Sequence, residues 1–313
     1  MNPARIVFPG FWFGKSDVAE AEALVRRGVG GFCLYNATAA QVYKLTHHLN
    51  NLAPQGPLLF CVDIRDNLSE VITDAPVLPA NNTLLSSKTS DATYRKGNLL
   101  GRMARAVGIN WVLAPVVDLG YASPALGESP MDATRLAEEM IAGISNAGAL
   151  SCMKYFPGLS GVLKNLTQLE DEEFIPYKHL FRRADAIMPS DMIFPNLDAN
   201  NRAMLSEKII KDLLRKRLNY KGMVVSFPLS QARLRSEGGE AVHMLYNGVE
   251  TLLSAQQPHA VIDAIEKEIA KGKLFEQVSQ AVSGLEMFVS KVAGGPEPDE
   301  IDRIFEVAKT TFE

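Results

Sequence analysis

Eight short apolar runs, rich in β-branched and aromatic residues, alternate along this chain with longer segments of helical periodicity. Parallel strands cannot be joined by tight turns and need long crossovers, usually helices, so the alternation predicts a parallel sheet covered by helices. Eight strand–helix units within 313 residues predict an α/β fold of the (β/α)8 TIM barrel type. The alternative is an open doubly wound sheet, but no G-x-G-x-x-G turn follows the first run. The expected strands are residues 5–9, 31–35, 58–63, 111–115, 150–154, 186–189, 223–226 and 250–254.

Helices are expected between these strands, and several carry their own boundary signals. A hydroxyl side chain before the first turn can accept a backbone N–H, and a glycine after the last turn can adopt the left-handed conformation that ends a helix. The expected capping residues are Ser16, Thr38 and Ser206, and the terminal glycines are Gly28, Gly108 and Gly148. The expected helices are residues 16–27, 38–50, 91–107, 132–146, 175–182, 206–217 and 237–246.

The last part of the chain predicts helices packed on the outside of the barrel, interrupted by the Gly-Gly-Pro sequence at residues 294–296. We therefore expect a single barrel domain over residues 1–295 and a helical tail over residues 296–313. No internal repeat and no second catalytic domain is expected.

Composition and charge exclude several classes of function. The formal net charge of −4 and the absence of a basic cluster with interleaved aromatic residues argue against a nucleic-acid partner. The sequence has neither a secretory signal pattern nor a continuous membrane-length apolar stretch, so we expect a cytoplasmic protein without membrane contact. Cys33, Cys61 and Cys152 lie singly in apolar runs and are expected to be reduced core residues. The five histidines show no ligand spacing, so neither a metal nor another cofactor is expected.

The residues at the strand ends decide what chemistry a barrel of this kind can perform, because its working face is the C-terminal mouth of the strands. The sequence places both charged and aromatic side chains there. The strand-end residues are Gly10, Asn36, Asp63, Asp118, Lys154, Tyr155, Ser190, Asp191, Ser226, Phe227 and Ser254.

Several stretches at these positions resemble, in order and spacing, the catalytic barrel of glycoside hydrolase family 3, particularly its single-domain bacterial β-N-acetylglucosaminidases (β-N-acetylhexosaminidases). The resemblance runs along most of the chain and implies a TIM barrel that cleaves sugars. It is carried by residues 28–31 (G-V-G-G), the strand of residues 59–63 that ends in Asp, residues 108–118 (G-I-N followed by A-P-V-V-D), residues 154–158 (K-Y-F-P-G, similar to K-H-F-P-G) and residues 203–226 (A-M-L-S to G-M-V-V-S).

The resemblance also implies where the catalytic groups should be, and they are missing. Retaining glycosidases use one carboxylate at the anomeric carbon and a second group that protonates the leaving oxygen. The family nucleophile is the first Asp of an S-D-D sequence after the seventh strand, where this chain has Ser226, Phe227 and Pro228. Phenylalanine has no lone pair to offer the reacting carbon, and each 1.36 kcal/mol of lost transition-state stabilisation slows a reaction about tenfold.

The acid/base and sugar-recognition positions have changed as well. The family's K-H-F-P-G-H-G-D loop supplies a His and an Asp, whereas residues 159–161 here read Leu-Ser-Gly. Its D-x-E-G-G-R keeps only Asp63, its E-R keeps only Glu128, and Asp191 replaces a His in the loop after the sixth strand. The combined loss predicts a catalytically degenerate protein, a pseudoenzyme that binds a sugar-like ligand or a protein partner at or near the former active site.

Two alternatives stay open. An active glycoside hydrolase could use relocated carboxylates, with Asp191, Glu128 and Asp66 as candidates, or a carboxylate from the loop of residues 170–173. Lys154 could instead act as an amine nucleophile, or it could be a buried partner of a nearby aspartate. The ligand-binding candidates are Asp63, Asp118, Lys154, Tyr155, Asp191, Ser226 and Phe227, of which Asp118 could be structural and Tyr155 and Phe227 could fill space once occupied by a ligand.

Overall fold

A computed structural model describes the whole chain except residues 87–89, 120–125, 128, 159–173 and 313. Eight parallel strands form one curled sheet in the order β10-β1-β2-β3-β4-β5-β6-β9, and a parallel bridge between Val225 and Thr251 links β9 back to the start of β10. The predicted α/β barrel is therefore confirmed. The strands are β1 (Val7–Trp12), β2 (Gly31–Tyr35), β3 (Leu59–Asp63), β4 (Trp111–Leu113), β5 (Leu150–Phe156), β6 (Ala186–Pro189), β9 (Met223–Val224) and β10 (Leu252–Ala255).

The position of the first strand along the sequence was predicted wrongly. The sequence predicted a strand over residues 5–9, but a short 3-10 helix, η1 (Pro3–Ile6), precedes β1, which continues to Trp12. Asn2 accepts the backbone N–H of Ala4 at 2.9 Å, and this cap starts the extra turn. Two aromatic residues of β1 therefore lie nearer the mouth of the barrel than the sequence suggested.

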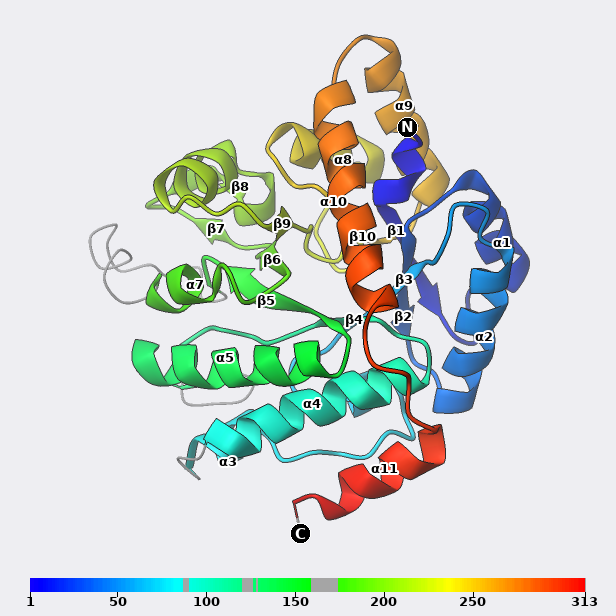
Figure 1. Cartoon of the computed structure of the whole chain (residues 1–313). Helices are drawn as coiled ribbons and strands as arrows, with labels where there is room; N and C mark the ends of the chain where they lie inside the picture. Colours follow the sequence, from blue (N-terminus) through cyan, green and yellow to red (C-terminus); the bar gives the residue numbers. More distant parts are fainter. Residues whose placement is uncertain (87–89, 120–125, 128, 159–173, 313) are drawn as a thin grey trace.

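Helices surround the sheet, and their positions follow the predicted segments closely (Figure 1). Residues at i, i+3 and i+4 are apolar in these segments, so each helix buries one face against the strands. The helices that follow the strands are α1 (Val18–Arg27), α2 (Ala39–Leu52), α3 (Asn81–Ser86), α4 (Ser90–Ala106), α5 (Pro130–Asn146), α7 (Ile175–Leu180), the π-helix η5 (Lys208–Arg217) and α8 (Glu237–Tyr246), with short 3-10 turns η2 (Leu68–Glu70) and η4 (Ala203–Leu205).

The predicted helix caps are mostly confirmed. Thr38 forms a complete capping box with Gln41 at the start of α2, and Gly28 ends α1 at a φ of 98°. Ser206 accepts the backbone N–H of Ile209 at 3.2 Å. The prediction for Ser16 was wrong: its hydroxyl accepts the backbone N–H of Trp12 at 2.9 Å, and the next residue, an aspartate, caps α1.

A two-stranded antiparallel hairpin between β6 and η5 was not predicted. It pairs β7 (Ile193–Phe194) with β8 (Asp198–Arg202), and the Asp198 carboxylate accepts the Ser206 hydroxyl at 2.7 Å. Its sequence, rich in Asn and Asp, reads as a loop because these residues are depleted in strands. The hairpin places Arg202 beside the loop that follows β6.

The N-terminal end of the barrel is closed by a helix from the C-terminal part of the chain. Trp111 at the start of β4 is fully buried, with its ring edge-on to Phe8 at 5.9 Å and to Phe288 at 5.4 Å between ring centroids. Phe288 belongs to α10 (Phe275–Ala293), and Arg5 ahead of β1 pairs with Glu286 of the same helix at 2.9 Å. The opposite, C-terminal end is left as the place where a site can form.

The predicted break in the C-terminal segment is confirmed. Helix α9 (Pro258–Ala270) is followed by α10, an extended connector and α11 (Ile301–Thr310), which packs against α4 (Figure 1). The stop falls at Gly294 and Gly295, since proline follows them and cannot continue a helix. Within the described ranges, no helix combines the length and hydrophobicity required to cross a membrane.

Candidate functional site at the barrel mouth

The centre of the mouth is an ion pair between the ends of β3 and β5, the strands on either side of β4. Lys154, at 0% side-chain exposure, pairs through Nζ with Asp63 and donates to the carbonyl oxygen of Ile64 at 2.7 Å. Burial by itself would lower the pKa of Lys154, but Asp63, together with smaller contributions from Tyr155 and Cys152, opposes that effect and the pKa is raised. Lys154 is therefore protonated at neutral pH, which disfavours its role as an amine nucleophile.

Tyr155 lies beside this pair and packs against Phe227. Tyr155 is 2% exposed, its ring centroid lies 5.1 Å from Lys154 Nζ and 5.7 Å from the ring of Phe227. Burial, partly offset by Lys154, raises the pKa of the Tyr155 phenol, so it stays neutral and can donate a hydrogen bond. The structure thus brings together four of the predicted site residues: Asp63, Lys154, Tyr155 and Phe227.

Ser226 has a structural role in the described barrel. Its fully buried hydroxyl accepts the backbone N–H of Leu253 in β10 at 2.9 Å, and its own N–H donates to the carbonyl of Thr251 at 2.8 Å. Together with the single Val225–Thr251 bridge, these contacts hold the end of β9 beside β10. Ser226 itself is fully buried, and its hydroxyl is engaged by the backbone of Leu253.

A second aromatic pair at the mouth was not singled out from the sequence. Trp12 and Tyr35, at the ends of β1 and β2, stack with their ring centroids 4.7 Å apart and an interplanar angle of 8°. Burial together with the negative charge of nearby groups, Asp63 among them, raises the pKa of Tyr35 well above its usual value. A side chain at Gly10 would collide with the Trp12 ring, which explains the glycine. The pair was missed because β1 was expected to end three residues earlier.

Asp66, a candidate relocated carboxylate, forms an ion pair with a lysine of α4. It pairs with Nζ of Lys96, a fully buried lysine of α4 that also donates to the carbonyl of Pro79 and to Asn81 Oδ1, both at 2.8 Å. Burial lowers the pKa of Lys96, and Asp66 opposes that shift. The carboxylate ties the loop after β3 to α4, a role that nothing in the local sequence indicated.

Asp191 lies in an arginine-rich part of the mouth. Its Oδ1 is 3.4 Å from Arg202 Nε, and its Oδ2 accepts the backbone N–H of Arg233 at 3.3 Å. Burial raises the pKa of the Asp191 carboxyl, and Arg202 opposes the shift. A carboxyl with a raised pKa is suited to donate a proton, so Asp191 keeps its place as a candidate acid.

The remaining predicted residues divide into two groups. Asp118 lies beside the turn after β5, where a side chain added at Gly158 would come within 3.6 Å of Asp118 Oδ1. Glu128, the loop of residues 159–161 and residues 170–173 lie outside the described residues.

The part of the chain that the structure describes contains no group of three or more metal-ligating side chains, and the three cysteines are free and buried.

Fold and site together define a (β/α)8 barrel with a charged pair and aromatic residues at its mouth. The sequence pattern of the "Glycosyl hydrolase family 3 N terminal domain" matches residues 6–285, and this chain belongs to that family.

Known relatives agree with this assignment. A beta-hexosaminidase of Xylella fastidiosa (strain M12) is 28% identical over 275 residues, covering 79% of this chain and 82% of the relative. The solved glycoside hydrolase family 3 beta-N-acetylglucosaminidase from Paenibacillus sp. str. FPU-7 superimposes with a TM-score of 0.84 at 25% identity, covering 98% of this chain and 67% of that one. A family 3 glycosyl hydrolase from Mycobacterium smegmatis str. MC2 155 gives a TM-score of 0.78 at 25% identity, covering 94% and 96%.

Proposed function

We propose that this chain is a catalytically degenerate member of glycoside hydrolase family 3, a pseudoenzyme that binds a sugar-like ligand at the barrel mouth. The observation that carries the proposal is the place of Phe227, which stands where the resemblance puts the family nucleophile and packs against Tyr155. A phenyl ring there offers the anomeric carbon neither a nucleophile nor a stabilising negative charge.

The surviving polar groups favour binding over chemistry. One carboxylate oxygen of Asp63 accepts a hydrogen bond from Lys154, and the other oxygen can accept one from a sugar hydroxyl. The Trp12–Tyr35 stack supplies a flat aromatic surface, and small-ligand sites combine such surfaces with a few placed polar groups. The carboxylate and the stack originate from adjacent strands β1, β2 and β3.

An active hydrolase with relocated carboxylates is the second candidate, because burial raises the pKa of Asp191 as a general acid requires. A protein partner in place of the sugar is the third outcome to be tested.

Hydrolysis is the first measurement. Chromogenic aryl β-N-acetylglucosaminide and β-glucoside would be incubated with concentrated protein, beside the Asp191→Asn variant and an active family member as positive control. We expect no turnover by this chain. Turnover that Asp191→Asn loses would overturn the pseudoenzyme proposal and identify Asp191 as a catalytic residue.

Binding is the second measurement, made by saturation-transfer NMR with N-acetylglucosamine. We expect a signal that weakens about tenfold in Trp12→Ala, which removes the aromatic surface, and stays unchanged in the surface control Glu276→Gln. Absence of both turnover and sugar binding would refute the sugar-like ligand and favour a protein partner.

A further inference from the structure

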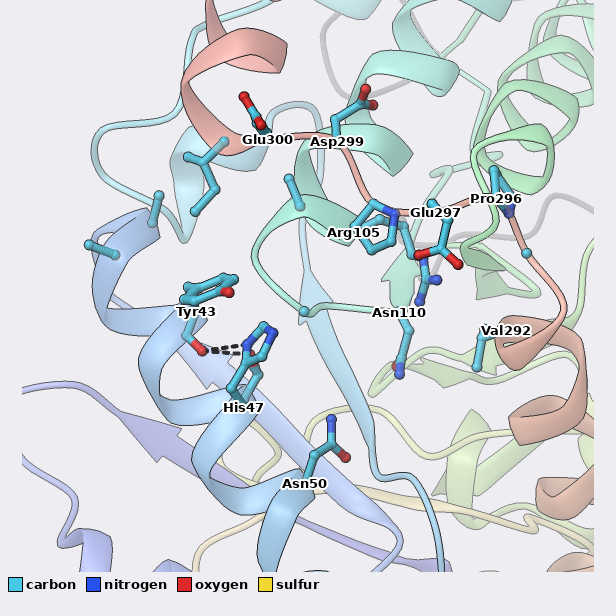
Figure 2. Close-up of a pocket in the computed structure, with 18 of the residues that line it drawn as sticks. Tyr43, His47, Asn50, Arg105, Asn110, Val292, Pro296, Glu297, Asp299 and Glu300 are labelled. Carbon is cyan, nitrogen blue, oxygen red and sulfur yellow. Dashed lines mark hydrogen bonds between the residues drawn. The ribbon is translucent and has the colours of Figure 1, made fainter.

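A second cavity, separate from the mouth, lies on the flank of the barrel. It has a volume of about 930 Å³ and is enclosed by α2, the end of α4 and the connector between α10 and α11 (Figure 2). We call it the flank groove, with Tyr43, His47, Asn50, Arg105, Asn110 and Glu297 among its lining residues. Its volume is in the range of small-molecule sites, about 300 to 1,000 Å³. Asn110 directly precedes β4, so the floor of the groove is at the end of the barrel opposite the mouth.

The floor of the groove is held rigidly by contacts between the helices and the strands. Thr46 on α2 donates to the carbonyl of Val107 at 2.9 Å, and a side chain at Gly108 would collide with the Thr46 hydroxyl at 2.2 Å. The Asn110 side chain accepts the backbone N–H of Phe60 at 2.9 Å and donates to the carbonyl of Leu58, just before β3, at 3.0 Å. These polar groups are engaged by the fold.

The outer wall is also fixed. Asp299 in the connector receives two hydrogen bonds from Arg102 of α4, at 2.7 and 3.1 Å. At the other end of the connector, Gly295 and Pro296 pack so closely on Gly148 that a side chain there would meet them at 2.6 to 3.2 Å. The groove is therefore formed in advance by a connector that is attached at both ends.

Arg105 and Glu297 carry opposite charges and both line this space, and neither forms an ion pair with a residue that the structure describes. Arg105, one turn after the paired Arg102, makes no hydrogen bond or ion pair with any residue that the structure describes, and its Nε is buried. Burial lowers the pKa of Arg105 and the nearby Glu297 carboxylate opposes the shift, although the two side chains do not form an ion pair. Figure 2 shows both side chains directed into the same part of the groove. A partly buried guanidinium is costly unless it is paired, so a structural role would be expected to bring a direct partner, as Arg102 has.

The surroundings limit the chemistry of a ligand. The Arg105 Nη groups can receive a carboxylate, and Glu297 can receive an ammonium group a short distance away. The carboxylates of Glu297, Glu300 and Asp302 surround the groove, so a purely anionic ligand would be repelled.

The facing wall on α2 is aromatic. The ring centroids of Tyr43 and His47 lie 3.9 Å apart, and His47 Nδ1 is 2.9 Å from the Tyr43 carbonyl oxygen (Figure 2). Tyr43 is 45% exposed, so its side chain is accessible to a molecule in the groove. This wall can pack against an apolar or aromatic group of the ligand.

We propose that the flank groove binds a free α-amino acid with an apolar or aromatic side chain, its carboxylate on Arg105, its ammonium on Glu297 and its side chain against Tyr43 and His47. No covalent step is involved. The site is distinct from the barrel mouth, so its occupancy is independent of whether the mouth binds a sugar.

The test uses L-phenylalanine and the two molecules that each keep one of its charges, 3-phenylpropionate and phenethylamine. Binding to the full chain would be measured by calorimetry and by the shift in Tm. We expect L-phenylalanine to bind at least about tenfold more tightly than either single-charge probe, because only the zwitterion satisfies both groups. Equal binding of 3-phenylpropionate would refute the zwitterion site and indicate a simple anion site.

Variants separate a binding site from a structural pair. Arg105→Gln and Glu297→Gln are each expected to weaken L-phenylalanine binding by about tenfold or more, while the exposed matched controls Arg235→Gln and Glu276→Gln leave it unchanged. Arg105→Lys retains the charge and covers the case in which Arg105→Gln does not fold. Failure of L-phenylalanine to bind, or binding that survives all three groove variants, would overturn the proposal.

Discussion

The buried Asp63–Lys154 pair at the mouth gives the sharpest test of the structure. Asp63→Asn keeps the size of the side chain but removes the charge that stabilises a lysine with 0% side-chain exposure. Breaking a buried pair by removing one partner costs about 3 to 5 kcal/mol, because the remaining charge is left uncompensated. We expect the free energy of unfolding at pH 7 to fall by that amount, measured by urea denaturation.

The pH dependence carries the more specific prediction. In the wild-type chain the pKa of Lys154 is raised by Asp63, so the pair stabilises the fold fully below the unfolded lysine value of about 10.4 and this stabilisation declines as pH rises above it. In Asp63→Asn the main opposing charge is gone and burial, the largest effect, is expected to lower the pKa of Lys154, so the variant gains stability as pH rises toward about 10.4. The difference in free energy between the two proteins should therefore shrink between pH 7 and pH 10.

Other titrating groups are common to both proteins and cancel in this difference. The double variant Asp63→Leu/Lys154→Met, with no buried charge left, is expected to be more stable than Asp63→Asn and to lack its pH dependence. A difference that stays constant from pH 7 to pH 10 would show that Lys154 does not carry an uncompensated charge in the variant, and would refute this account of the mouth.

Three further predictions concern the scaffold. Lys96→Met is expected to lower the free energy of unfolding by about 3 kcal/mol in urea denaturation, because the Asp66 carboxylate loses its buried cation; a cost below about 1 kcal/mol would contradict the role assigned to this pair. Gly108→Ala is expected to cost more than about 1 kcal/mol and to lower the Tm, because φ is +85° and the new methyl group meets Thr46; an unchanged Tm would contradict the close approach. Thr38→Ala is expected to cost about 1 kcal/mol by the same denaturation assay, since it removes the capping box of α2, whereas Thr38→Ser should retain most of it.

The sequence predicted most of the fold because the determining signals are local. The alternation of apolar runs with helical segments depends only on residue order, and a capping residue such as Thr38 acts on the turn beside it. The first strand was misplaced and the β7–β8 hairpin was missed for the same reason: the Asn2 cap and the Asp198 contacts override the average preferences of their segments.

The candidate site depended on both levels. The sequence placed Asp63, Lys154, Tyr155 and Phe227 at strand ends, and parallel strands bring their C-terminal ends to one face, so these residues meet. Their partners could not be chosen from the sequence, since several aspartates were within possible reach of Lys154.

Amino-acid order by itself determined the barrel, its family resemblance and the phenylalanine at position 227, because these are properties of patterns and residue types. Only the tertiary structure decided that Asp66 pairs with Lys96 and that Asp63 pairs with Lys154. It also decided that Arg105 lines a groove in which no described residue forms an ion pair with it. The physical reason is that charge pairing and burial depend on distances between residues that are far apart in the chain, and packing alone sets those distances.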